Sequence, residues 1–169
     1  MTLDAILDEL LTREGDFSAD PIDRGGPTRY GITATTLGNW RGWNRPATRA
    51  EVEALTRVEA KAIYIARYIE APGFTAENIP DLKLRVALID DGVNTGPMNA
   101  IKRLQRAVGV KADGIFGPVT KQALAVHGAD WVRVELVKSR CIYYGQIVAN
   151  DVSQRRFIVG WLSRALGFL

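Results

Sequence analysis

The sequence predicts a mainly α-helical fold, a helical bundle with one small irregular or β-hairpin segment around residues 15–35. Apolar residues recur at spacings of three and four along most of the 169 residues, as they do on the buried face of a helix. Glycine, proline, aspartate and threonine interrupt that pattern between residues 15 and 33, which indicates a loop or a hairpin. Hydrophobic residues make up 47 % of the chain and charged residues 24 %, a balance that lets a chain of this length bury its own core.

The first half of the chain carries a start signal for each of its predicted helices. The first helix begins after Thr2 and has an apolar stripe formed by Leu3, Ile6, Leu7, Leu10 and Leu11. Two capping boxes, Thr48-x-x-Glu51 and Thr56-x-x-Glu59, each open a helix. The helix after the second box ends at Pro72-Gly73 and buries a face made of Ala60, Ile63, Tyr64 and Tyr68. Another helix follows Pro80, with a stripe of Leu82, Val86, Ile89 and Val93.

The second half of the chain predicts further helices, two of which open on proline. Pro97 begins a helix that ends at Gly109 and has a stripe of Met98, Ile101, Leu104 and Val108. Pro118 begins a short helix that closes near Gly128. Asp130 is expected to cap a longer helix with an inner stripe of Val134, Val137, Cys141, Tyr144 and Val148. A last helix carries Phe157 and Trp161.

The chain is expected to divide near Asn94 to Pro97, into residues 1–94 and residues 95–169 packed into one compact unit. A tight turn, Ala-Asp-Gly-Ile-Phe-Gly at residues 112–117, lies in the second region. Its glycines suit a connection between two helices, and we expect Ile115 and Phe116 to belong to the core.

The scarcity of histidine and cysteine excludes several classes of enzyme. Cys141 is the single cysteine and His127 the single histidine, so the chain can form no internal disulfide. A zinc site of the His/Cys type needs three or four such ligands, and neither a metal nor another cofactor is expected. His127 lies in an ordinary helix-end context, which argues against a Ser-His-Asp or Cys-His hydrolase. A lone thiol is also typical of synthesis in a reducing cytoplasm.

Charge is distributed unevenly along the chain. Residues 1–94 contain 11 Lys and Arg against 15 Asp and Glu, and residues 95–169 contain 11 against 4. A basic second region favours an anionic polymer as partner, although solvated helix faces would give the same count. No basic helix is interleaved with aromatic residues, so a nucleic-acid partner is not expected.

No apolar run reaches the ~18 residues that cross a bilayer, and an integral membrane protein is not expected. The first fourteen residues contain four acids and one arginine, the opposite of a basic signal-peptide start. We therefore expect a protein that is synthesised in the cytoplasm without a signal peptide. A monomer is also expected.

Glu14 is the first candidate for catalysis. It continues the buried stripe of the first helix, four residues after Leu10, so its carboxyl group is expected to be partly shielded from water. Asp20 and Asp23 follow in an irregular segment that leads to Gly25-Gly26 and Thr28. A glycosidase needs one carboxylic acid to protonate the leaving oxygen and a second carboxylate across the bond. The alternative is a solvent-facing helix-end glutamate followed by aspartates that serve only turn chemistry.

The same residues carry a resemblance to a known family. Glu14-Gly15-Asp16-Phe17 and then Asp20-Pro21-x-Asp23-x-Gly25-Gly26-x-Thr28-x-Tyr30-Gly31-Ile32-Thr33 resemble the phage and bacterial N-acetylmuramidases of glycoside hydrolase family 108. The resemblance implies a lysozyme-like fold with a catalytic region at residues 1–94 and with Glu14 as the catalytic acid. The spacing is also similar to the Glu/Asp/Thr triad of phage lysozymes, which implies catalytic roles for Asp23 and Thr28. Asp16 departs from the pattern, because the family usually has a second glycine there.

The resemblance continues into the second region. Leu104-Gln105, Gly109-Val110 and Asp113-Gly114-Ile115-Phe116-Gly117-Pro118-x-Thr120 are similar to the core motif of peptidoglycan-binding domains. Arg140-x-x-x-Tyr144 and Gly160-Trp161-Leu162-x-Arg164 fit the C-terminal pattern of the family. Residues 95–169 are therefore expected to form a helical peptidoglycan-binding region. The residues expected to bind substrate are Asp20, Tyr30, Asp90 and Asn94, although Asn94 could instead only cap a helix.

Together these observations predict a peptidoglycan hydrolase with lysozyme activity. It would cleave the β-1,4 bond between N-acetylmuramic acid and N-acetylglucosamine in glycan strands of the cell wall. A phage or prophage endolysin, released to the periplasm through a holin or a secretion system, fits this description, as do a secretion muramidase and a gene-transfer-agent lysin. A lytic transglycosylase and a non-catalytic peptidoglycan-binding protein are the alternatives. Retention or inversion depends on the distance between two carboxyl groups and stays open.

Overall fold

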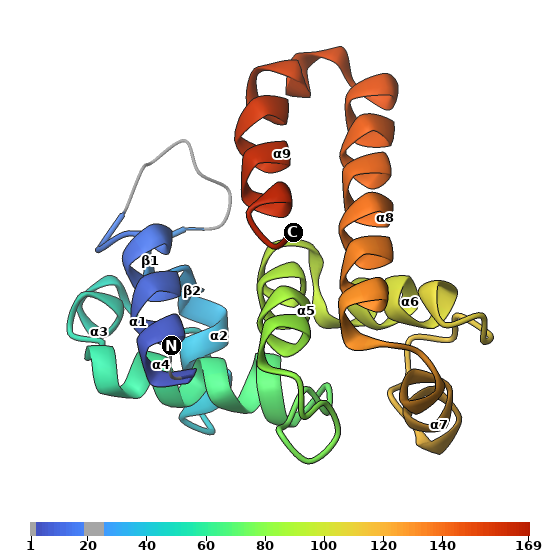
Figure 1. Cartoon of the computed structure of the whole chain (residues 1–169). Coiled ribbons are helices and arrows are strands. Elements are labelled where there is room, and N and C mark those ends of the chain that lie inside the picture. The colour runs from blue at the N-terminus through green and yellow to red at the C-terminus, as the bar shows by residue number, and fades with distance from the viewer. Residues whose placement is uncertain (1–2, 19–25) are drawn as a thin grey trace. The chain divides into compact units, whose positions relative to one another are not determined.

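The fold is mainly α-helical with one small antiparallel sheet, as the sequence predicts. The computed structural model describes residues 3–18 and 26–169, so the predicted cap Thr2 and the candidates Asp20 and Asp23 lie outside the described residues. The chain forms two compact units, Met1–Arg67 and Tyr68–Leu169 (Figure 1). Among the described residues, no helix is both long and apolar enough to span a membrane.

The first unit is built from short helices around a hairpin. Its elements are α1 (Leu3–Glu14), β1 (Thr28–Arg29), β2 (Ile32–Thr33), α2 (Ala34–Trp40), α3 (Arg49–Glu53) and α4 (Arg57–Ile65). Helix α1 packs on α4, and the hairpin contacts α2 and α3. The predicted stripe of α1 is buried except for Leu3, which is half-buried. The core of this unit includes Ile6, Leu7, Leu10, Leu11, Leu37, Leu55 and Ile63. A π-helical turn, η1 (Ala66–Glu70), carries the chain into the second unit.

The two predicted capping boxes differ in the structure. Thr48 and Glu51 form a complete box, in which Thr48 N–H donates to Glu51 Oε2 at 2.7 Å and Glu51 N–H donates to Thr48 Oγ1 at 3.3 Å. Thr56 accepts from Glu59 N–H at 3.2 Å, but the Glu59 carboxylate pairs with Arg41 at 2.7 and 2.8 Å. The second box is therefore only half formed, because a cation from α2's C-terminal end competes for its glutamate.

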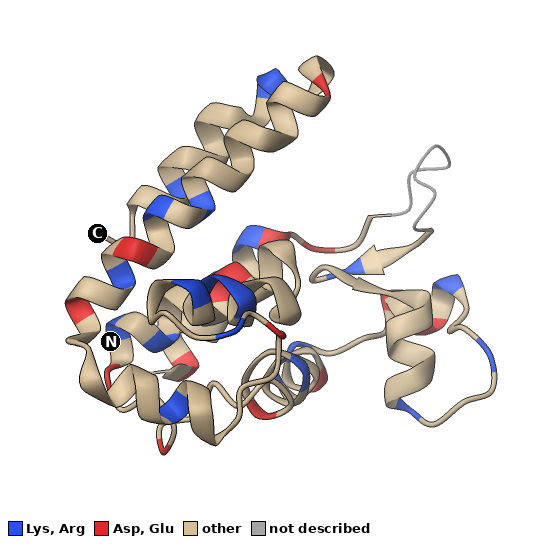
Figure 2. Ribbon diagram, turned by 90° about the vertical axis from the view of Figure 1, so that its right-hand side faces the viewer, with Lys and Arg blue, Asp and Glu red and all other residues tan. Residues whose placement is uncertain are grey.

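The second unit contains α5 (Leu82–Thr95), α6 (Pro97–Ala107), α7 (Pro118–Val126), α8 (Ala129–Asn150), η2 (Val152–Phe157) and α9 (Ile158–Leu166). Helices α5, α6 and α8 pack against one another, and α8 and α9 form a long antiparallel hairpin (Figure 1). Basic residues lie at the turn of this hairpin, where η2 carries Arg155 and Arg156 (Figure 2).

Three predicted details of the second unit are wrong. Helix α8 begins at Ala129 with Gly128 as its cap residue, so Asp130 lies in the first turn, where it pairs with Arg133 at 2.7 Å. Met98 is 59 % exposed and Ile115 is 70 % exposed, although both were expected in the core. Apolar spacing marks the inner face of a helix but leaves the residues at its ends undecided, because neighbouring elements determine what covers them. Phe116 is half-buried and lies edge-on to Phe74, with 6.4 Å between ring centroids.

Candidate active site

Glu14 is the last residue of α1, and the helix ends there because Gly15 adopts a left-handed conformation with φ +86°. Glycine is the usual residue at such a helix end, since it has no Cβ to clash in this conformation. The carbonyl of Gly15 accepts from Tyr30 N–H at 3.2 Å, which ties the helix end to the hairpin. Glu14 is half-buried, as its place in the stripe predicts.

The hairpin that faces Glu14 has a two-residue loop, Tyr30-Gly31. Arg29 pairs with Ile32, and Tyr30 and Gly31 have φ +52° and +71°, the signs that a type I′ turn requires. Thr28 lies at the start of β1, where its N–H and C=O exchange hydrogen bonds with the backbone of Ser18, both at 2.8 Å. The structure thus brings Glu14, Thr28 and Tyr30 into one small region of the first unit.

Gly31 lies directly against Glu14. A Cβ at residue 31 would be 3.1 Å from Glu14 Oε2 and 3.0 Å from the Tyr64 hydroxyl oxygen. A side chain at residue 31 would therefore push on Glu14 and Tyr64, and the positive φ of this residue independently favours glycine. Tyr64 is a functional candidate that sequence reasoning missed, because its place on the apolar face of α4 identified it only as a core residue. The Tyr64 side chain is indeed buried, and its hydroxyl donates to the Tyr30 carbonyl at 2.9 Å.

Acidic and basic side chains around the turn lie next to each other. Asp16 Oδ1 accepts from Arg29 Nε at 2.8 Å, and this carboxylate raises the pKa of the Arg29 guanidinium. Asp16 therefore neutralises a neighbouring cation at the position where the family usually has glycine. Arg29 and Arg57 lie over the Tyr30 ring, at 5.2 and 6.0 Å from its centroid.

Helix α4 is attached to α1 by a small ionic network. Asp8 Oδ1 accepts from Arg57 Nε at 2.9 Å, and Asp8 Oδ2 accepts from Lys61 Nζ at 2.8 Å. The hydrogen bonds from Lys61 and Arg57 lower the pKa of the Asp8 carboxyl below its usual value. These contacts hold the helix that carries Tyr64 against the helix that carries Glu14.

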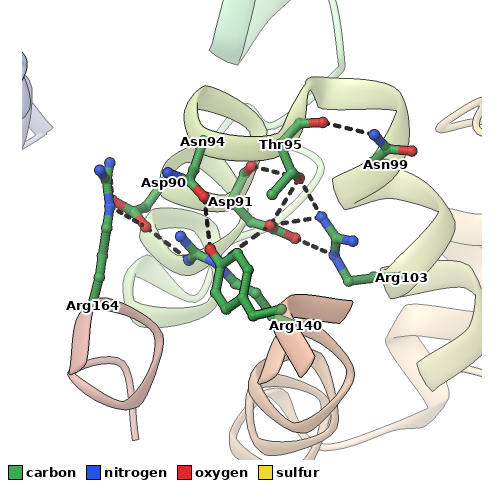
Figure 3. Close-up of polar contacts among 9 residues, drawn as sticks. Asp90, Asp91, Asn94, Thr95, Asn99, Arg103, Arg140 and Arg164 are labelled. Carbon is green, nitrogen blue, oxygen red and sulfur yellow. Dashed lines mark hydrogen bonds and ion pairs between the residues drawn. The ribbon is translucent and has the colours of Figure 1, made fainter. Parts of the chain in front are cut away.

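Asp90 and Asn94 lie in the second unit, within a network of polar side chains (Figure 3). The buried Asp90 carboxylate pairs with Arg140 Nη1 at 2.7 Å and with Arg164 Nη2 at 2.8 Å. Asn94 Oδ1 accepts from the Tyr144 hydroxyl at 2.7 Å. These contacts hold α8 and α9 on α5. Arg140, Tyr144 and Arg164, which belong to the C-terminal motifs, therefore stabilise the packing of these helices. The substrate-binding role of Asp90 and Asn94 stays a prediction.

Asp91 and Arg103 form a second ion pair beside the first. Arg103 Nε and Nη2 each donate to the Asp91 carboxylate at 2.8 Å, and both side chains are buried (Figure 3). Arg140 Nε lies 3.5 Å from Asp91 Oδ1. Burial opposes the charge of Arg140, but Asp90 and Asp91 outweigh it and raise the pKa of that guanidinium. Arg103 therefore belongs to the core, although the sequence alone left it among the cations available to a polymer.

The peptidoglycan-binding-like motif is folded around Gln105. Its buried amide donates to Asp113 Oδ1 at 2.7 Å and to the Ile115 carbonyl at 3.0 Å, and it accepts from Gly114 N–H at 2.9 Å. The bond from Gln105 also lowers the pKa of the Asp113 carboxyl. The motif thus defines the turn between α6 and α7, and Ile115 at its outer edge is left in solvent. The described residues contain no group of three His, Cys, Asp or Glu side chains that could hold a metal ion.

Comparison with known proteins identifies the family of the chain. The glycosyl hydrolase 108 family matches residues 7–96, and a predicted peptidoglycan domain matches residues 99–166. The chain belongs to the glycosyl hydrolase 108 family. The solved structure of SagA from Brucella abortus is similar at 30 % sequence identity with a TM-score of 0.75, over 98 % of this chain and 94 % of that one. No curated protein sequence matches.

This member of the glycosyl hydrolase 108 family is therefore a glycoside hydrolase whose substrate is peptidoglycan, and its fold is lysozyme-like. The first family match ends at residue 96 and the second begins at residue 99, whereas the compact units divide after Arg67. The division expected near residues 94 and 95 stays a prediction. The units differ from the family matches because α5 is packed on α6 and α8 by the Asp90 and Asp91 ion pairs.

Proposed function

We propose that the enzyme is an N-acetylmuramidase that cleaves the β-1,4 bond between N-acetylmuramic acid and N-acetylglucosamine, with Glu14 as general acid. The observation that carries the proposal is the position of Glu14. It is a half-buried carboxyl group at a helix end, next to a turn whose glycine lies directly against the carboxyl oxygen. An acid in such a place can reach a glycosidic oxygen while its surroundings stay fixed.

The roles of the remaining residues follow from the family pattern. Glu14 would donate its proton to the leaving oxygen as the glycosidic bond breaks and positive charge develops on the sugar ring. Asp23 would stabilise that charge or activate water, and Thr28 would orient the water. Tyr30 and Asp20 are proposed to contact the sugars beside the cleaved bond. Protonation by Glu14 should contribute most to the rate, because the sugar oxygen is a poor leaving group when it is not protonated.

The proposed setting is a phage or prophage endolysin. The enzyme would be made in the cytoplasm and reach the wall through a holin or a secretion system.

Replacing Glu14 by glutamine tests the proposal. Glu14→Gln should fold normally and lose roughly 10²–10⁴-fold in turnover on purified peptidoglycan, since it removes the proton transfer. Glu9→Gln is the matched control, because Glu9 lies on the same helix in an exposed pair with Arg13 and should keep wild-type activity. Wild-type clearing by well-folded Glu14→Gln would remove the proposal. Mass analysis of the products separates hydrolysis from a lytic transglycosylase, whose products end in 1,6-anhydro sugars.

A further inference from the structure

Tyr30 has a backbone conformation that its side chain disfavours. It is the single described residue other than glycine with a positive φ, and glycine, asparagine or aspartate is usual at the first position of a type I′ turn. Strained residues at candidate active sites persist when surrounding contacts over-determine them. The contacts that hold Tyr30 in this conformation therefore bear on the shape of the site.

The backbone of Tyr30 is bonded from both sides. Its N–H donates to the Gly15 carbonyl at 3.2 Å, one residue after Glu14, and its carbonyl accepts from the Tyr64 hydroxyl at 2.9 Å. The first bond ties the turn to the helix end, and the second ties it to α4. Tyr64 is 3 % exposed, so its hydroxyl is shielded from water that could replace the bond.

The Tyr64 hydroxyl also lies beside the carboxyl group of Glu14. A Cβ at Gly31 would be 3.0 Å from the Tyr64 oxygen and 3.1 Å from Glu14 Oε2, so both oxygens border the same small space. A shift of the turn would therefore change the surroundings of the Glu14 carboxyl.

We propose that Tyr64 is a positioning residue, whose hydroxyl holds the strained Tyr30-Gly31 turn in the register that keeps the Glu14 carboxyl in its place against Gly31. The proposal rests on the proposed role of Glu14 as general acid. Tyr64 itself transfers no proton to substrate, and it acts through the turn. The ionic contacts of Asp8 with Arg57 and Lys61 extend this arrangement, since they hold α4 and therefore Tyr64 on α1.

The test is a double-mutant cycle between Tyr64→Phe and Tyr30→Asn, assayed on soluble peptidoglycan fragments below the unfolding temperature of each protein. Tyr64→Phe removes only the hydroxyl, and we expect kcat to fall about tenfold with KM within about twofold, as the loss of one shielded hydrogen bond implies. Asparagine accepts the left-handed conformation without that bond. In the Tyr30→Asn background, Tyr64→Phe should therefore lower kcat by less than about threefold.

A control variant and a second measurement separate the effect of the Tyr64 hydroxyl on the turn from other effects of the substitutions. Tyr143→Phe removes a hydroxyl from the second unit, where the ring stacks on Arg103, and should leave kcat unchanged. Thermal unfolding of the same four proteins measures the coupling independently, so a change in substrate binding by Tyr30→Asn does not obscure it. Wild-type kcat in Tyr64→Phe, or equal losses in both backgrounds, would overturn the proposal. Glu14→Gln, assayed beside them, separates this result from a failure of the general acid itself.

Discussion

Replacing Asp91 by asparagine should strongly destabilise the second unit while barely changing its shape. The Asp91 side chain is 0 % exposed and Arg103 is 5 % exposed, and two hydrogen bonds of 2.8 Å join them. Asparagine keeps one acceptor but turns an N–H group toward the guanidinium, and it leaves Arg103 buried without a counter-ion. Removing one partner of such a pair costs about 3–5 kcal/mol. Arg140, 3.5 Å from the same carboxylate, loses part of its compensation as well, which favours the upper end of that range.

Urea unfolding followed by circular dichroism measures this loss. Glu135→Gln is the control, because its ion pair with Lys138 on α8 is exposed and should contribute less than about 1 kcal/mol. The double variant Asp91→Leu, Arg103→Leu should lose less stability than Asp91→Asn alone. Two apolar side chains leave no buried charge, whereas Asp91→Asn leaves Arg103 buried without a counter-ion. If Asp91→Asn unfolds within about 1 kcal/mol of wild type, the buried pair does not stabilise the unit as argued.

Two further predictions concern pH and salt. Arg45 and the Thr48 backbone lower the pKa of Glu51 to about 2, so the stability that this carboxylate contributes is present above pH 4.5 and is lost as the pH falls toward 2. Glu51→Gln should therefore reduce the fall in unfolding temperature between pH 4.5 and pH 2. An unchanged fall would contradict the stabilising role of the Glu51 carboxylate. Binding of Glu14→Gln to purified sacculi should weaken as salt rises, because exposed charges are screened over roughly 8 Å at physiological ionic strength. Replacing three exposed arginines by glutamate should weaken this binding further without unfolding the protein; the three are Arg106, Arg155 and Arg156. Binding that changes neither with salt nor with these substitutions would exclude a role for charge.

The predicted helices are mostly present because their signals are local. Pro97 and Pro118 open helices, Thr48 and Glu51 close a capping box, and Gly15 ends α1 at Glu14. Each signal acts through the backbone of a few neighbouring residues, so the sequence carries it directly. Ile115 was placed wrongly because its surroundings come from other elements, and Asp130 because α8 begins one residue before it, at Ala129. Ile115 is exposed because the side-chain amide of Gln105 binds Asp113 and the Ile115 carbonyl and so fixes the turn. The spacing of apolar residues does not predict these hydrogen bonds.

The sequence by itself determined the helical fold class, the helix that ends at Glu14 and the family to which the motif around it belongs. It did so because helix periodicity, end signals and a dense motif depend on residues close together in the chain. Tertiary structure alone decided which charged and hydroxyl groups pair when they lie far apart in the sequence. It placed Tyr64, fifty residues from Glu14, beside the Glu14 carboxyl, and it made Arg103 the buried partner of Asp91. Such pairings arise only when helices distant in sequence pack together and shut out water, because an isolated charge or hydroxyl in that interior must find a partner.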